Sequence, residues 1–258
     1  MPIFSHSAEH NATQKEIWDW YNSPGAFRRI MPEWEGIQPI NAGALKDGEE
    51  TIFKVGIGPV KLKWIARHHS VVEGKSFADD MIKGPFGKWS HQHTFEATSD
   101  DITTVRDKVD YKLPFHIFTG WSKGITVLPR MKQMFHYRST RVSKDLERIQ
   151  ATFSKSRQKV LVSGSTGMIG LQLCAFLEAA GHDVYRLMRP TSKLPPDVNP
   201  EKIVRWNDLT GDIISGSFEG FDCVIHLAGA GIGDKRWSKK RKQSVSYTHL
   251  TLPTIRSV

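Results

Sequence analysis

The chain has 258 residues, enough for two domains, and 39% of them are hydrophobic against 24% charged. This composition excludes fibrous and low-complexity classes, and no apolar run reaches the about 18–20 residues that a membrane helix needs. The net charge of +9 includes six basic residues between positions 235 and 242, a run more typical of a solvated helix face than of a nucleic-acid site. Cys174 and Cys223 lack disulfide or zinc spacing. We therefore expect a cytoplasmic protein with no nucleic-acid partner and no membrane span.

Residues 1–150 have the pattern of an α+β domain. A strand near residues 3–7 precedes a helix over residues 13–21 and a second short helix. Residues 127–149 have the spacing of one long amphipathic helix, with Leu128, Met131 and Phe135 among its apolar positions. Between these helices, alternating patterns predict an antiparallel meander with strands over residues 50–57, 60–69, 75–82, 89–97 and 102–111. Residues 151–157 are the predicted linker to a second domain.

Three stretches of this region, residues 23–29, 84–93 and 134–138, resemble START-like (SRPBCC, polyketide-cyclase-type) domains, which have the helix-grip fold. The resemblance implies a curved sheet wrapped around a long helix. Such a fold can enclose an apolar cavity suited to a lipid or a polycyclic ligand. The resemblance thus implies an apolar small molecule as a partner of the N-terminal domain.

His91 and His93 alternate on one predicted strand and so share a face. They could hold a metal if a third ligand joined them, and His68 and His69 are one source of such a ligand. Histidines placed in this way more often make ordinary hydrogen bonds, so no metal site is predicted. The tryptophans are expected to form core rather than a ligand cage: Trp18, Trp34, Trp64, Trp89 and Trp121.

Residues 158–243 alternate between strands and helical segments. A strand over residues 159–163 is followed by a Gly-rich turn and a helix over residues 169–180. Further strands are predicted over residues 183–188, 202–206 and 222–227. Strands separated by crossovers imply a parallel sheet, here the first half of an α/β doubly wound Rossmann fold with its fourth strand at an edge.

The turn has the pattern G-x-x-G-x-x-G, formed by Gly164, Gly167 and Gly170. The glycines permit a tight turn, a close approach of backbone to a pyrophosphate, and close packing of helix on strand. The helix N-terminus adds a partial positive charge that favours phosphates. We predict a dinucleotide site formed by Gly164, Ser165, Thr166, Gly167, Met168, Ile169 and Gly170.

With Ser163 in place of a threonine, this turn resembles that of extended short-chain dehydrogenases/reductases. Residues 226–237 narrow the resemblance to NAD-dependent epimerase/dehydratase-like proteins. In that family the turn after the fourth strand lies along the cofactor. The resemblance therefore implies cofactor contacts by Leu227, Ala228, Gly229 and Ala230.

The end of the second strand of a Rossmann fold selects between NAD and NADP. An acidic residue there binds the ribose 2′-hydroxyl, whereas an arginine pairs with a 2′-phosphate. This chain has Arg186 and Arg189 and no acid, which favours NADP over NAD, with Arg189 better placed. The alternative for both arginines is an ordinary solvated loop.

The superfamily's chemistry normally uses a Tyr-x-x-x-Lys pair, and none of the five tyrosines is followed four residues later by lysine. The catalytic residues are therefore unknown. Residues 245–254 match the translation of a transposon-end sequencing adapter. We accordingly expect residues 244–258 to be a non-native tail, the natural sequence to continue beyond Gln243, and this chain alone to be inactive.

Two functions are compatible with these features. The first is an NAD(P)-dependent epimerase or oxidoreductase acting on a small-molecule substrate, fused to a domain that binds an apolar ligand. The second is a non-catalytic protein that binds a dinucleotide and a lipid and acts as a sensor. A Tyr-x-x-x-Lys pair beyond Gln243 would favour the enzyme, and its absence the sensor.

Overall fold

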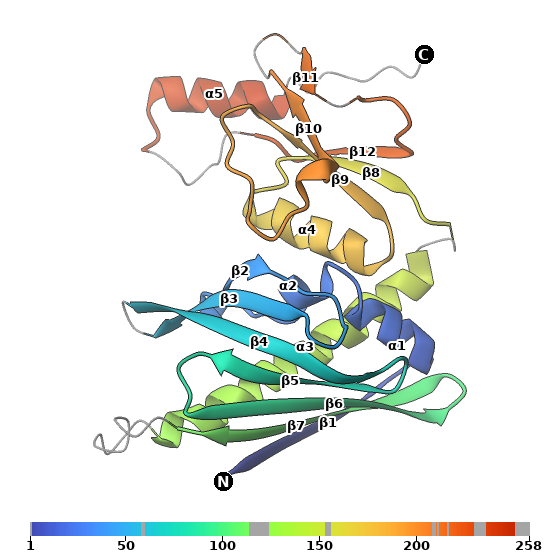
Figure 1. Ribbon diagram of the computed structural model, residues 1–258. Coiled ribbons are helices and arrows are strands. Elements are labelled where there is room, and N and C mark those ends of the chain that lie inside the picture. Colours follow the sequence, from blue (N-terminus) through green and yellow to red (C-terminus); the bar gives the residue numbers. More distant parts are fainter. Residues whose placement is uncertain are drawn as a thin grey trace. The chain divides into compact units, whose positions relative to one another are not determined.

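The computed structural model describes residues 2–57, 60–113, 124–152, 156–207, 210, 212–215, 217–229 and 236–250 (Figure 1). The chain divides into two compact units, the first built mainly from residues 1–157 and the second mainly from residues 158–258. Among the described helices, none is long and apolar enough to cross a membrane.

A seven-stranded antiparallel sheet forms the first unit, in the order β1-β7-β6-β5-β4-β3-β2. All five strands predicted between residues 50 and 111 are present as β3 to β7. Each of them pairs antiparallel with the strand that follows it in the sequence, so the predicted meander is confirmed. The sequence did not predict β2, a four-residue strand that contains Pro39. The strands are β1 (Ile3–His10), β2 (Gln38–Asn41), β3 (Glu50–Ile57), β4 (Val60–Val72), β5 (Ser76–Lys83), β6 (Lys88–Ser99) and β7 (Ile102–Lys112).

The helices of this unit are α1 (Gln14–Tyr21), α2 (Ala26–Ile30), the 3-10 helix η1 (Glu33–Glu35) and the long α3 (Gly124–Thr152). Thr13 starts α1 with a capping box, because its hydroxyl accepts from the Glu16 N–H and the Glu16 carboxylate accepts from the Thr13 N–H. Helix α3 runs along one face of the sheet (Figure 1). The result is the helix-grip arrangement that the sequence resemblance implies.

The buried face of α3 carries Met131, Phe135, Val142 and Leu146, whose spacing matches the helical period. These side chains belong to two core clusters with residues of the sheet. Leu128, also expected in the core, is 42% exposed, one turn before the buried run begins. Of the tryptophans, Trp18, Trp64 and Trp89 are buried, Trp34 is 53% exposed and Trp121 lies outside the described residues.

His10, at the end of β1, gives this unit a pH-dependent stability. Its ring is buried, with Nδ1 2.8 Å from the Ser143 hydroxyl, and burial lowers its pKa to about 4 against the opposing charge of Asp107. In the unfolded chain it protonates near pH 6.5. We expect the free energy of unfolding to fall as the pH drops from 6.5 to 4, by roughly 3 kcal/mol from this group. Above pH 6.5 the group contributes no pH dependence.

Urea unfolding at several pH values measures this effect. His10→Asn should flatten the profile between pH 4 and 6.5, whereas His136→Asn, at an exposed position of α3, should leave it unchanged. Equal slopes for wild type and His10→Asn would show that the pH dependence arises elsewhere.

The second unit is a five-stranded sheet in the order β11-β10-β9-β8-β12. Its described elements are β8 (Lys159–Ser163), α4 (Met168–Ala179), β9 (Asp183–Met188), the 3-10 helix η3 (Pro200–Lys202), β10 (Ile203–Trp206), β11 (Ile213–Ser215), β12 (Cys223–His226) and α5 (Lys239–Leu250). Strand β10 is parallel to β9, and β12 is parallel to β8. The order β10-β9-β8-β12 is the 3-2-1-4 order of a doubly wound fold.

Strands β11 and β12 and helix α5 can be compared with the prediction. Strand β11 was not predicted and pairs antiparallel with β10, so the sheet is mixed rather than wholly parallel. Strand β12 lies at an edge, as expected, with Val224 43% exposed. Helix α5 includes residues 244–250, and Val245 is buried. The non-native origin of residues 244–258 stays a prediction.

Candidate functional site

The turn between β8 and α4 holds three glycines in different environments. Gly164 has a φ of +65°, and a Cβ there would lie 2.6 Å from the Leu227 carbonyl carbon. A Cβ on Gly170 would lie 2.2 Å from the Gly164 carbonyl oxygen. A Cβ on Gly167 would meet that same oxygen at 3.3 Å and no other described atom within 4 Å. The chain's own packing therefore requires Gly164 and Gly170, whereas the space beside Gly167 is open.

Space and polar groups at this turn fit a dinucleotide. Thr166 and Gly167 are exposed, as are Met168 and Ile169 at the start of α4. The Ser165 hydroxyl is buried, and its oxygen has no hydrogen-bond partner among the described residues. A pyrophosphate beside Gly167 would lie at the N-terminus of α4, where backbone N–H groups and the helix dipole favour an anion. The residues present thus fit the cofactor that the sequence resemblance implies.

Ser163 ties the end of β12 to the end of β8. Its hydroxyl oxygen accepts from the backbone N–H groups of Leu227 and Ala228, at 3.2 and 3.3 Å. The same oxygen lies 2.8 Å from Nδ1 of His226, to which the hydroxyl donates its proton. A hydroxyl at this position, serine here and threonine in the resembled family, therefore holds the start of the next turn beside the Gly-rich turn.

This bond places Leu227 and Ala228, two of the predicted contact residues, against Gly164. Gly229 follows them and is exposed. Ala230 lies outside the described residues. The predicted contacts of β12 and of the Gly-rich turn thus come together at one end of the sheet.

The two arginines predicted to select the cofactor have different environments. Arg186 lies within β9, is 3% exposed, and donates from Nη1 to the Ser165 carbonyl at 3.4 Å. Arg189 follows β9 directly and is exposed, and its carbonyl accepts a 2.7 Å hydrogen bond from Arg205. Arg186 therefore supports the Gly-rich turn from within the sheet, and only Arg189 keeps the surface position that a 2′-phosphate requires.

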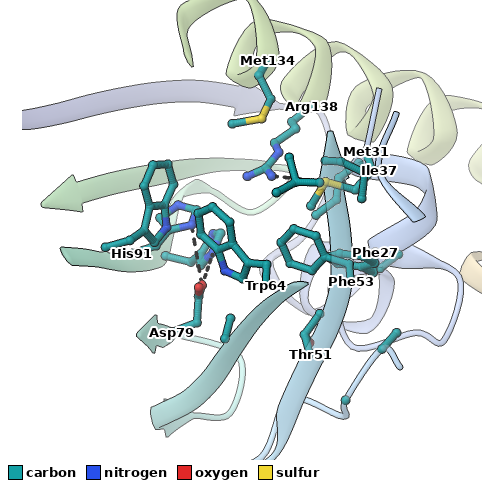
Figure 2. A pocket seen from close by; sticks show the side chains of 18 of the residues that line it. Phe27, Met31, Ile37, Thr51, Phe53, Trp64, Asp79, His91, Met134 and Arg138 are labelled. Carbon is teal, nitrogen blue, oxygen red and sulfur yellow. Dashed lines mark hydrogen bonds and ion pairs between the residues drawn. The ribbon is translucent and has the colours of Figure 1, made fainter. Parts of the chain in front are cut away.

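A cavity of about 540 Å³ lies inside the first unit. Its volume is within the range of about 300–1,000 Å³ that is usual for small-molecule sites. Most of its lining is apolar and includes Phe27, Phe53, Trp64, Trp89 and Met131. Figure 2 shows the Trp64 and Phe53 rings side by side, stacked with their centroids 5.4 Å apart. Trp64 and Trp89 are thus part of the core and part of the cavity wall, whereas Trp18 belongs to the core alone.

Arg138 brings a positive charge to this apolar cavity from α3. Its Nη2 lies 3.6 Å from the Met31 sulfur, as Figure 2 shows, and its Nε is buried without a hydrogen-bond partner among the described residues. None of the described carboxylates forms an ion pair with it. Burial lowers the pKa of Arg138 from its usual value. The cavity wall therefore carries a cation that no described carboxylate pairs with.

A cluster of polar side chains also lies in the cavity wall and consists of Asp79, His91 and His93. Strands β5 and β6 pair Asp79 with His91, and β6 and β7 pair His93 with Asp107, so the four side chains share one face of three adjacent strands. Figure 2 shows the Asp79 carboxylate turned toward His91. All four side chains are at most 15% exposed.

The third member of this group is Asp79, not His68 or His69 as the sequence suggested. His68 is buried with Nδ1 3.0 Å from the Ala44 carbonyl, and His69 is half-buried beside Asp80. Asp79 was missed because its place opposite His91 depends on the register of β5 and β6. The sequence did contain one signal for Asp79: it is a charged residue at a position of an alternating strand that faces inward.

The four groups influence one another's ionisation. Burial acts to raise the pKa of Asp79 and of Asp107, but the adjacent histidines outweigh it and hold both pKa values below the usual range. Burial lowers the pKa of His91, whereas for His93 the contacts with Asp107 and Asp79 outweigh burial and raise the pKa. Both carboxylates are therefore ionised at neutral pH.

Comparison with known protein families divides the chain at the same place. Residues 11–136 match the family described as polyketide cyclase / dehydrase and lipid transport. Residues 160–254 match the NAD dependent epimerase/dehydratase family. The first match covers strands β2–β7 of the antiparallel sheet, and the second begins in β8 and includes the Gly-rich turn.

Individual relatives agree with this division. An epimerase family protein of Mycobacterium leprae is 35% identical over 92 residues, which are 36% of this chain and 28% of the relative. One from Mycobacterium bovis is 36% identical over 92 residues, 29% of its length. The crystal structure of a nucleoside-diphosphate sugar epimerase from Corynebacterium glutamicum is similar to 95% of this chain, with a TM-score of 0.69 and 28% identity.

The chain spans 48% of the length of that structure and less than a third of the two curated relatives. The matches cover both of its units. The chain is therefore similar to the polyketide cyclase / dehydrase and lipid transport family in its first unit and to the NAD dependent epimerase/dehydratase family in its second.

Proposed function

We propose that the second unit binds NADP(H), or NAD(H) less tightly, at the Gly-rich turn and serves an epimerase or oxidoreductase reaction on a small molecule. This proposal rests on the open space beside Gly167, together with the buried Ser165 hydroxyl, which has no hydrogen-bond partner among the described residues. When bound, the nicotinamide supplies hydride transfer. This chain's residues bind the pyrophosphate through the turn, hold β12 beside it through Ser163, and orient the turn through Arg186.

The choice of cofactor is assigned to Arg189, whose guanidinium can form charge-assisted hydrogen bonds to a 2′-phosphate. We expect the full chain to bind NADPH more tightly than NADH, and Arg189→Ala to weaken NADPH binding roughly tenfold while NADH binding is unchanged. Titration followed by nicotinamide fluorescence measures both affinities. Lys193→Ala, a matched loss of charge at an exposed position in the same loop, is the control. Equal affinities for the two cofactors would remove this assignment.

For the first unit, we propose that the cavity binds an apolar ligand with one acidic group. The lining accommodates the apolar part, and Arg138 is the group that pairs with the acid. The ion pair of Arg130 with Glu35, at 2.8 Å, involves an exposed arginine and so marks where the cavity meets the surface. The unit would then hold or deliver an apolar substrate for the dinucleotide unit.

Oleate and oleyl alcohol test this proposal because they differ in the acidic group. We expect Arg138→Met to weaken oleate binding roughly tenfold, the loss of one buried charge-assisted contact, and to leave oleyl alcohol binding unchanged. Competition with a fluorescent fatty acid gives both affinities. Lys132→Met, at an exposed position on the same helix, should change neither. A wild-type chain that binds neither compound would contradict the proposal.

The sensor hypothesis assumes the same two binding sites as the enzyme hypothesis. It differs from the enzyme hypothesis in that no hydride is transferred. It draws support from the cavity, which by itself suits a binding protein. Loss of reduced-nicotinamide absorbance when a full-length relative is incubated with cavity ligands would favour the enzyme. A stable absorbance with both sites occupied would favour the sensor.

A further inference from the structure

We infer that Asp79, His91 and His93 form a binding site for one divalent first-row transition-metal ion in the wall of the cavity. This inference is independent of the dinucleotide site. The three side chains come from two neighbouring strands, β5 and β6, and their ligand atoms all lie within 4.8 Å of one another. Two imidazoles and a carboxylate are the donor set of many zinc and iron sites.

The contacts of Asp107 determine which nitrogen atoms face the site. Its Oδ1 lies 3.1 Å from His91 Nε2 and 2.8 Å from His93 Nδ1. A carboxylate accepts hydrogen bonds, so His91 Nε2, which is hydrogen-bonded to Asp107, carries the hydrogen of that ring; His93 Nδ1 has no hydrogen-bond partner among the described residues. In the neutral His91 ring Nδ1 is therefore left with a free lone pair, and Nε2 is the His93 nitrogen that faces Asp79. Asp107 is thus a positioning residue that does not itself line the cavity.

Nδ1 of His91 and Nε2 of His93 face the same oxygen. Asp79 Oδ2 lies 3.6 Å from His91 Nδ1 and 3.7 Å from His93 Nε2, too far for hydrogen bonds. Two ligand atoms bound to one zinc ion at about 2.1 Å with tetrahedral angles lie about 3.4 Å apart. The two observed separations are close to that value. A carboxylate oxygen that lies at this spacing from two imidazole nitrogens is a geometry that a metal ion can bridge.

Burial and charge favour an ion at the same place. Asp107 is buried and Asp79 is half-buried, and neither forms an ion pair with a lysine or an arginine within the described part of the chain. A divalent ion would balance both carboxylates. Since all three ligands line the cavity, the remaining coordination position opens toward the bound ligand. This is the arrangement of a site with three protein ligands and one exchangeable position.

Zinc and cobalt titrations of the full chain, after treatment with a chelator, test the inference. We expect one Zn²⁺ per chain by calorimetry, and visible absorption typical of nitrogen-ligated Co²⁺. His91→Gln keeps a donor near Nε2 for Asp107 and removes Nδ1, and His93→Asn keeps a donor near Nδ1 and removes Nε2. Each of these variants, and Asp79→Asn, should lower the Zn²⁺ affinity at least a hundredfold.

Two further variants complete the experiment. Asp107→Asn should lower the affinity by about tenfold to a hundredfold, the usual effect of losing an outer partner of a ligand. His69→Gln, at a half-buried histidine of the adjacent strand β4 that lies beside Asp80, should leave it unchanged.

The wild-type chain alone can overturn the inference, even where a variant fails to fold. No Zn²⁺ binding at micromolar concentration, or a Co²⁺ spectrum that stays that of the aqueous ion, would mean that a proton rather than a metal bridges Asp79 and the histidines. Binding that is equal in wild type and in the folded Asp79→Asn, His91→Gln and His93→Asn variants would also overturn it, because the ion would then lie elsewhere.

Discussion

Gly167→Val is expected to abolish dinucleotide binding, with an affinity loss of at least a hundredfold, while the chain stays folded. A valine side chain would fill the open space beside this residue, where the pyrophosphate must approach the backbone. Its Cβ would meet the Gly164 carbonyl oxygen at 3.3 Å, which a small shift relieves. Fluorescence titration with NADPH measures the loss, and circular dichroism with thermal unfolding measures the fold.

Gly170→Ala is the matched comparison at the same turn. Its Cβ would lie 2.2 Å from the Gly164 carbonyl oxygen and 2.7 Å from the Ser165 Cα, so the backbone itself must move. This variant should lower the melting temperature as well as the affinity. A Gly167→Val chain that binds NADPH like the wild type would remove the cofactor from this turn.

Asp145→Leu is expected to destabilise the first unit by about 3–5 kcal/mol. Asp145 on α3 accepts two hydrogen bonds from Arg29 on α2, the one from Nε being 2.7 Å long. Both side chains are buried, at 2% and 7% exposure. Leucine would leave the guanidinium buried without this carboxylate, and the cost of such a charge exceeds the attraction that the pair provides.

The double variant Arg29→Met/Asp145→Leu separates the two effects. Because it removes both charges and keeps apolar volume, its free energy of unfolding should return to within about 1–2 kcal/mol of the wild-type value. Urea unfolding followed by tryptophan fluorescence reports mainly on this unit, since most of the eight tryptophans precede residue 158. A single variant that costs under 1 kcal/mol would show that the pair is not buried in solution.

Sequence patterns predicted most of the elements and the Gly-rich turn. Six strands of the first sheet (β1 and β3–β7), the long helix α3 and the β8–α4 turn follow from patterns that repeat within a few residues, and such patterns are local. The glycines at 164, 167 and 170 were assigned separate roles from their spacing, and the structure gives each a distinct environment. Strands β2 and β11 were missed because runs of four and three residues are too short to show alternation.

The tertiary structure decided which distant side chains meet. Asp79 reaches His91 only in the register that β5 and β6 adopt, and a shift of one residue would turn it to the other face. Arg29 and Asp145 are 116 residues apart, and no local pattern links them. Arg186, placed by the sequence at the cofactor's phosphate, is buried under the turn because the sheet's packing sets its exposure. Periodicity is a property of short segments, whereas register and burial depend on the packing of the whole unit.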